Sequence, residues 1–169
     1  DRVYNFNTTG YLSSMTISTY DGNQSAATAG EDVALIKQET YRAKTNNLTA
    51  GYDSNNKFAI NDSEQQGSLK TLTTFAGSQG FERVNEQTGY RFGGTIVKNL
   101  TVFYYEKDNQ NVRAGDALDE AILKEQRSYR NGDLTKLQSI TVMGGEQGQE
   151  KPDRVYNFNT TGYLSSMTI

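Results

Sequence analysis

This chain opens and closes with the same seventeen residues, DRVYNFNTTGYLSSMTI, at residues 1–17 and 153–169. The two copies lie 152 residues apart (153 − 1), and no position differs between them. A fixed period in a sequence is typical of arrays in which one structural unit follows another. The sequence therefore predicts that residues 1–152 form one repeat unit of a tandem array and that residues 153–169 begin the next identical unit. The alternatives are an added copy of the first strand at the end of the chain, or a plain duplication at its two ends.

Strand-forming segments dominate the chain and are separated by clusters of Gly, Asn, Asp and Ser, which favour turns. The hydrophobic fraction is only 34%, but 11 Tyr and 7 Phe supply large apolar side chains. Such a composition suits a thin, aromatic-rich sheet better than a helical bundle. The sequence predicts an all-β fold, an antiparallel β-hairpin strip or a solenoid. Its expected strands cover residues 2–7, 11–20, 32–43, 68–76, 81–86, 94–105 and 134–143.

One segment has the composition of a helix. Residues 115–129 are rich in Ala, Leu, Glu and Lys, with Asp116 as a candidate N-cap and Glu120 four positions before Lys124. Local propensity predicts at most one short helix, near residues 116–127. The neighbouring segments are strand-like, so a strand imposed by its surroundings is the alternative.

The repeated stretch contains a hairpin motif. Tyr4 and Phe6 lie on one face of a strand because side chains alternate with a period of two. Asn7 and Gly10 favour a turn, since Asn bonds nearby backbone and Gly adopts positive φ. The chain then returns, so that Leu12 can meet the aromatic side chains across the hairpin. The second copy places the same structural residues at Tyr156, Phe158, Asn159, Gly162 and Leu164.

Weaker versions of this motif recur at residues 52–58, 103–109 and 129–134, and the anchors Tyr105, Tyr129 and Phe158 are spaced as expected for two-strand units. The pattern resembles that of the YD-repeat, or Rhs, family, in which Tyr-Asp-x-x-Gly-x-Leu hairpins follow one another. The resemblance is good at residues 4–12 and 156–164, partial at Tyr52 and Tyr105, and absent from about half of the chain. In the best copy, Asn7 replaces the usual Asp. The resemblance implies a long strip of β-hairpins that builds shells or stalks. The Asp-Pro signature of the self-cleaving members is missing, because the only proline, Pro152, follows Lys151.

The residue types present exclude most catalytic chemistry. The chain has no Cys and no His, so thiolate zinc sites, Cys nucleophiles and Ser-His triads are impossible here. The carboxylates Asp116, Asp119 and Glu120 are explained better by helix capping than by sugar hydrolysis. We therefore expect no enzyme, no cofactor and no metal site, although the Asp- and Asn-rich loops leave Ca²⁺ open as a weaker alternative. A net charge of −3 argues against nucleic acid as a partner, and no apolar stretch is long enough to insert into a membrane.

These expectations combine into one functional hypothesis. The chain is expected to be a structural repeat unit of a secreted bacterial surface fibre, stalk or sheath. Its partners would be neighbouring copies of itself, in the same chain or in other chains, joined by β-strand pairing. The alternative is an adhesin module that binds a glycan or a host surface.

Overall fold

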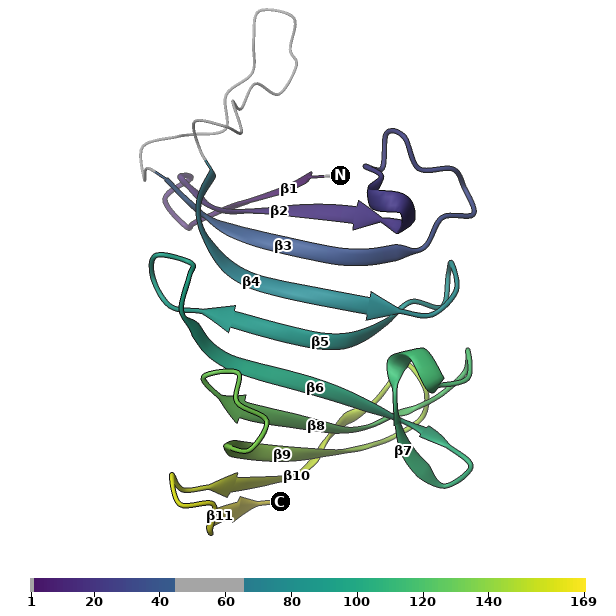
Figure 1. Ribbon diagram of the computed structural model, residues 1–169, viewed down its shortest axis with the longest axis vertical. Coiled ribbons are helices and arrows are strands. Elements are labelled where there is room, and N and C mark those ends of the chain that lie inside the picture. Colours follow the sequence, from purple (N-terminus) through teal and green to yellow (C-terminus); the bar gives the residue numbers. More distant parts are fainter. Residues whose placement is uncertain (1, 45–65) are drawn as a thin grey trace, which may run out of the picture.

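The computed structural model describes residues 2–44 and 66–169, which form an open antiparallel sheet of eleven strands (Figure 1). The strand order is β1-β2-β3-β4-β5-β6-β8-β9-β10-β11, and β7 pairs with β6 outside this path. Apart from β7, consecutive strands are thus neighbours, which confirms the predicted all-β, antiparallel strip. The weak motif at residues 52–58 lies outside the described residues. The strands are β1 (Arg2–Phe6), β2 (Leu12–Tyr20), β3 (Leu35–Ala43), β4 (Gln66–Ala76), β5 (Arg83–Tyr90), β6 (Val97–Lys107), β7 (Gln110–Arg113), β8 (Leu123–Arg130), β9 (Leu137–Gly144), β10 (Lys151–Phe158) and β11 (Leu164–Thr168).

The helix suggested by the composition of residues 115–129 does not form. A single 3₁₀ turn, η2 (Ala114–Asp116), opens this segment, and its second half is strand β8. In the sheet, Tyr129 pairs with Leu100 of β6 on one side and with Leu137 of β9 on the other. Pairing on both sides outweighs a local helix preference of a few tenths of a kcal/mol per residue.

The only proline of the chain lies in a strand rather than in a turn. Pro152 lies inside β10 and pairs with Met143 of β9. The register shifts between Pro152 and Arg154, so the proline sits next to a β-bulge. Proline is tolerated there because a bulge locally interrupts the ladder of backbone hydrogen bonds.

The two faces of the sheet differ in chemistry. On one face, Met15 pairs with Tyr4 on one side and with Tyr41 on the other, which gives a row of apolar side chains. The opposite face carries hydroxyl and amide groups that bond across the strands, such as the Oγ1 atoms of Thr16 and Thr40, 2.9 Å apart. Most side chains of this single-layer sheet stay partly exposed, which explains how the fold forms with few aliphatic residues.

The sheet contains an internal repeat that the sequence does not reveal by identity. Met15 pairs with Tyr41 between β2 and β3, and Leu100 pairs with Tyr129 between β6 and β8. The next pair along repeats as well: the hydroxyls of Thr101 and Ser128 lie 2.9 Å apart, as those of Thr16 and Thr40 do. Strands β6 and β8 thus repeat the arrangement of β2 and β3.

The hairpins β4–β5 and β9–β10 repeat each other in the same way. Phe75 pairs with Val84 next to a register shift, and Met143 pairs with Pro152 next to the same shift. Both members of the pair move by 68 positions (143 − 75 and 152 − 84). The strands β1–β4 and the strands β5, β6, β8 and β9 are therefore two versions of one four-strand arrangement, and β10–β11 begin a third.

A buried cluster lies where η2 contacts β4, β5 and β6. Tyr105, Ala114 and Ala121 are buried there, and Ala76 and Phe103 pack against them. The Tyr105 side chain is only 6% exposed, and its hydroxyl donates a 2.9 Å hydrogen bond to the Val84 carbonyl oxygen. This cluster ties the β6–β7 hairpin to the preceding strands.

Tyr105 should make the fold sensitive to alkali. Burial raises the pKa of its phenol from 10.0 to about 12, with Arg83 opposing and Glu150 adding to the rise. The unfolded chain releases this proton near pH 10, whereas the folded chain holds it. The contribution of protonated Tyr105 to the free energy of unfolding is therefore complete below pH 10 and is lost as the pH rises toward 12. Thermal unfolding between pH 8 and about 12 should therefore show a shallower fall for Tyr105→Phe than for the parent chain.

The same substitution should cost about 1 kcal/mol at neutral pH, because the bond to the Val84 carbonyl is lost. Tyr163→Phe, which removes the hydroxyl group of an exposed tyrosine, is the matched control. An unchanged alkaline slope in Tyr105→Phe would contradict the assignment.

Candidate interaction site at the two sheet edges

The two copies of the repeated stretch fold into the same hairpin. In the first copy, Phe6 of β1 pairs with Leu12 of β2, and Gly10 has a φ of 82° in the turn between them. In the second copy, Phe158 of β10 pairs with Leu164 of β11, and Gly162 has a φ of 86°. Tyr4 and Tyr156 also occupy matching positions, opposite Met15 and Met167.

An asparagine side chain organises each turn. The Asn7 Oδ1 atom accepts hydrogen bonds from the backbone N–H of Thr9 at 3.1 Å and of Tyr11 at 2.9 Å. Asn159 does the same for Thr161 at 3.0 Å and Tyr163 at 2.9 Å. A carboxylate at this position could accept the same bonds.

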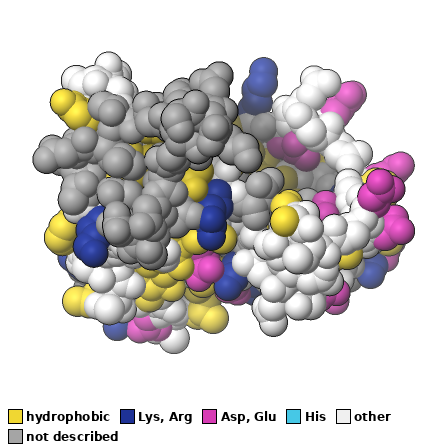
Figure 2. Space-filling view, turned by 90° about the horizontal axis from the view of Figure 1, so that it is seen from above, with side chains coloured by type: hydrophobic (Ala, Val, Ile, Leu, Met, Phe, Trp, Pro, Cys, Tyr) yellow, Lys and Arg dark blue, Asp and Glu magenta, His cyan; other side chains and the backbone are white. Residues whose placement is uncertain are grey.

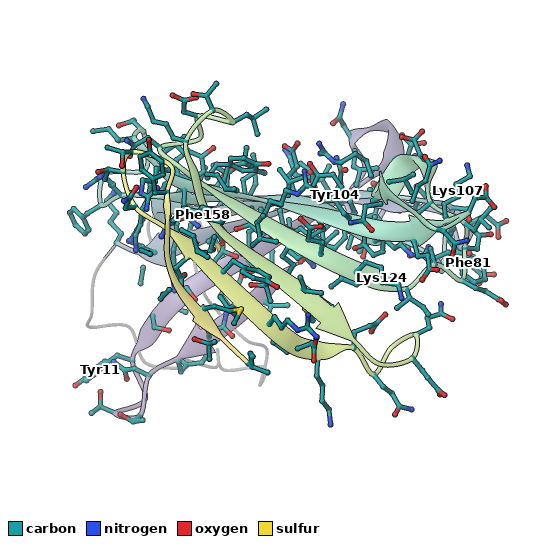
Figure 3. All side chains as sticks on the ribbon, turned by 90° about the horizontal axis from the view of Figure 1, so that it is seen from below. Tyr11, Phe81, Tyr104, Lys107, Lys124 and Phe158 are labelled. Carbon is teal, nitrogen blue, oxygen red and sulfur yellow. The ribbon has the colours of Figure 1, made fainter. Side chains whose placement is uncertain are left out.

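The structure does not bring the two hairpins together. They occupy the two ends of the strand order, with β1 at one edge of the sheet and β11 at the other. Tyr11, at the tip of the first hairpin, and Phe158, in the second, lie apart in Figure 3. The ten predicted site residues therefore form two separate five-residue sets rather than one site.

The two identical hairpins have different neighbours. Among the described strands, β1 pairs with β2 alone, whereas its copy β10 pairs with both β9 and β11. The reverse holds for the second strand, since β2 pairs with β1 and β3 whereas its copy β11 pairs with β10 alone. Each copy thus has the neighbour that the other lacks.

Side-chain exposure follows the same complementarity. Leu12 and Met15 of β2 are 1% exposed, whereas the corresponding Leu164 and Met167 of β11 are 56% and 52% exposed. In the first strand the order is reversed, because Val3 of β1 is 55% exposed and its copy Val155 is half-buried between two strands. Figure 2, which looks onto the β1 end from above, shows hydrophobic side chains reaching the surface among charged ones.

Arg130 fastens the second hairpin to the strands before it. Its guanidinium donates to the carbonyl oxygens of Leu137, at 2.8 Å, and Phe158, so it spans β8, β9 and β10. In the first half of the sheet, Arg42 bonds the carbonyl oxygens of Leu69 at 2.7 Å and Tyr90 at 3.0 Å, which spans β3, β4 and β5.

A glutamate in the turn of each of the hairpins β4–β5 and β9–β10 makes a similar hydrogen bond to a strand further back in the sheet. The Glu150 carboxylate accepts the backbone N–H of Leu123 at 3.2 Å, and Glu82 accepts that of Leu35 at 3.1 Å. Our sequence analysis missed both links. The pair Tyr-Arg at residues 41–42 and 129–130, and Gln-Gly-x-Glu at residues 79–82 and 147–150, were the available signals.

The acidic side chains that the structure describes do not cluster as a metal site would require. Within residues 2–44 and 66–169, no group of three or more acidic side chains is arranged to hold a metal ion. The loop side chain of Asp133 is engaged in its own turn, where it accepts bonds from the N–H and hydroxyl of Thr135 at 3.0 and 2.6 Å. One of the Asp- and Asn-rich loops considered for Ca²⁺, at residues 53–56, lies outside the described residues.

Comparison with known proteins finds no family model, no curated protein and no solved structure that matches this chain. Among the residues that the structure describes, no helix has the length and apolar character needed to cross a membrane. The two sheet edges, with their identical sequence and complementary neighbours, are therefore the features from which a function can be argued.

Proposed function

We propose that this protein is a structural repeat unit whose sheet passes from one 152-residue unit to the next by β-strand pairing. The carrying observation is that residues 1–17 and 153–169 form identical hairpins at opposite edges of one sheet, each with the neighbour that the other lacks. When the second copy of one unit is taken as the first copy of the next, β9 becomes the neighbour of β1, and β3 becomes the neighbour of β11. Every strand on the path then has two partners.

The internal repeat supports this continuation. The pairing of β9 with β10, which would join two units, has the same register and the same bulge as the pairing of β4 with β5 inside one unit. The sheet already makes this kind of junction once within each unit. A second use of it needs no new type of contact.

This arrangement has definite dimensions. Eight strands of each unit lie on the path, namely β1–β6, β8 and β9. At a strand spacing of about 4.8 Å, one unit would advance the sheet by at most about 38 Å, and each four-strand half by about 19 Å. Twist and curvature shorten this rise.

The setting that we propose is a fibre, stalk or sheath on a bacterial surface, outside the cell. The absence of cysteine and the YD-like hairpins of the repeated stretch are consistent with it. Such a unit works by connecting to its own kind, so no catalytic group is needed.

A chain of two units followed by residues 1–17 tests the proposal. Hydrogen exchange should protect the β1 amides of the second unit as strongly as those of β10, whereas β1 of the first unit should exchange as an open edge. Electron microscopy of longer chains should show regular fibres with an axial repeat of at most about 38 Å.

The matched control carries about ten Gly and Ser residues between Pro152 and the second unit, which lets the units separate. Equal exchange of the second unit's β1 in the two chains, together with separate globules in the images, would overturn the proposal. Separate globules that bind a glycan would favour the adhesin alternative.

A further inference from the structure

A cavity of about 460 Å³ opens beside β2 at the β1 edge of the sheet. Arg2 of β1 pairs with Ile17, and beyond this pair Ser18 and Thr19 line the cavity. Its other wall comes from the loop after η1 (Asp21–Asn23) and includes Ala27, which is exposed.

The corresponding place in the second half of the sheet is filled. There η2 packs against β4, β5 and β6, and Ala114 is buried in the cluster that includes Ala76 of β4. Strand β5 contributes as well, since the Val84 carbonyl oxygen accepts the hydrogen bond of Tyr105 and the Asn85 Oδ1 atom accepts one from the Arg113 Nε–H at 3.1 Å. The β4–β5 hairpin is therefore what closes this region. Phe81 at its turn lies at the same end of the sheet as Lys107 of the β6–β7 hairpin (Figure 3).

The hairpin that repeats β4–β5 is β9–β10. Beyond their common register, the two have the same turn geometry: φ is 120° at Gly77 and 112° at Gly145, and 81° at Gly80 and 74° at Gly148. Strand β10 has the same sequence as β1, from residues 153 and 1 onward. In the first half of the sheet, the place that β10 would take beside β2 is therefore occupied by β1.

We infer that the cavity beside β2 is the docking site for the β9–β10 turn, residues 144–152, of a second copy of this chain. This inference rests on the proposed function, in which that copy is the preceding unit. The turn would lie beside Ser18, Thr19 and Ala27, as Ala76 and Val84 at the ends of the β4–β5 turn lie beside the cluster of Tyr105 and Ala114. The second unit would then be held by a side contact in addition to backbone pairing.

A thiol placed at Ala27 tests this contact, because the chain has no cysteine of its own. In a chain of two units followed by residues 1–17, Ala27→Cys is made either in the first unit or in the second. A maleimide should label the first-unit thiol freely and the second-unit thiol at least tenfold more slowly. Asp32→Cys, at an exposed position outside the cavity lining, is the matched control and should react at similar rates in both units.

A bulkier change gives a second readout. Ala27→Trp should lower the melting temperature when it is in the second unit, where the turn must fit, and leave it unchanged in the first unit. Equal labelling rates together with equal melting temperatures would overturn the docking site. Hydrogen exchange at β1 of the second unit separates the two proposals. Protected β1 amides with freely labelled Ala27→Cys would leave the continuous sheet standing and remove its side contact.

Discussion

Met15→Ala is expected to lower the free energy of unfolding by about 2–4 kcal/mol, the usual cost of truncating a buried methionine. Met15 is 1% exposed and lies between Tyr4 and Tyr41 on the apolar face of the sheet. The loss combines the apolar area that stays in water with the cavity left between the two tyrosines. Urea unfolding, with the midpoint and the slope fitted together, measures it.

The control for this substitution is built into the chain. Met167 has the same sequence neighbours as Met15 but is 52% exposed on the edge strand β11, so Met167→Ala should cost less than about 0.5 kcal/mol. The contrast tests whether burial depends on the following strands. Equal losses for the two variants would show that the hairpin alone determines the environment of this methionine.

In a chain of two units, the methionine at the junction should become buried. It would be residue 167 of the first unit and residue 15 of the second, with β3 of the second unit beside it. Its replacement by alanine should then cost as much as Met15→Ala in a single unit. A junction methionine that still tolerates truncation would count against the continuous sheet.

The sequence predicted the strands well where alternation and turn residues agreed. The hairpin with Tyr4, Phe6 and Leu12 follows from a period of two and from a turn that needs positive φ at Gly10. The helix prediction for residues 123–130 was wrong because helix propensity is a local quantity. Their Leu, Lys, Glu and Gln favour a helix, but two flanking strands impose the extended conformation.

The internal repeat is not visible in the sequence because cross-strand pairs of residues, rather than single residues, are preserved. Asn5 faces Ser14 across β1 and β2, with a hydrogen bond of 3.3 Å between their side chains. At the corresponding place Gly89 faces Asn99, and a Cβ atom added to Gly89 would lie 2.5 Å from the Asn99 Oδ1 atom. The large amide has moved from one strand to the other while the filled volume stays similar. A comparison that matches residues one by one does not detect such an exchange.

The edges, by contrast, could be foreseen from the sequence. Two identical stretches in one chain predict two similar hairpins, and an apolar strand at a sheet edge favours pairing with another strand. What the sequence could not provide was their placement at opposite ends of one sheet. That placement depends on the whole strand order, in which β3 to β9 separate the two copies.

The turns that join the hairpins lead to the last prediction, in which Gly77→Ala lowers the free energy of unfolding by about 3 kcal/mol or more. Gly77 has a φ of 120°, a conformation that costs other residues about 1–3 kcal/mol. A Cβ atom there would also lie 2.5 Å from the carbonyl oxygen of Phe81, which is backbone and cannot rotate away. The turn must therefore open, and Glu82 would lose its position for the link to Leu35.

Gly80→Ala in the same turn is the matched control. Gly80 has a φ of 81°, but no atom lies within 4 Å of the added Cβ, so only the strain of about 1–2 kcal/mol remains. Urea midpoints of the two variants should differ accordingly, and equal midpoints would refute the role of the close approach to Phe81. Gly145 repeats Gly77 at the turn before β10, with a φ of 112° and a distance of 2.9 Å from the added Cβ to the Gln149 carbonyl oxygen. Gly145→Ala should therefore weaken the link of Glu150 to Leu123, and in an array this loss would recur at every junction between units.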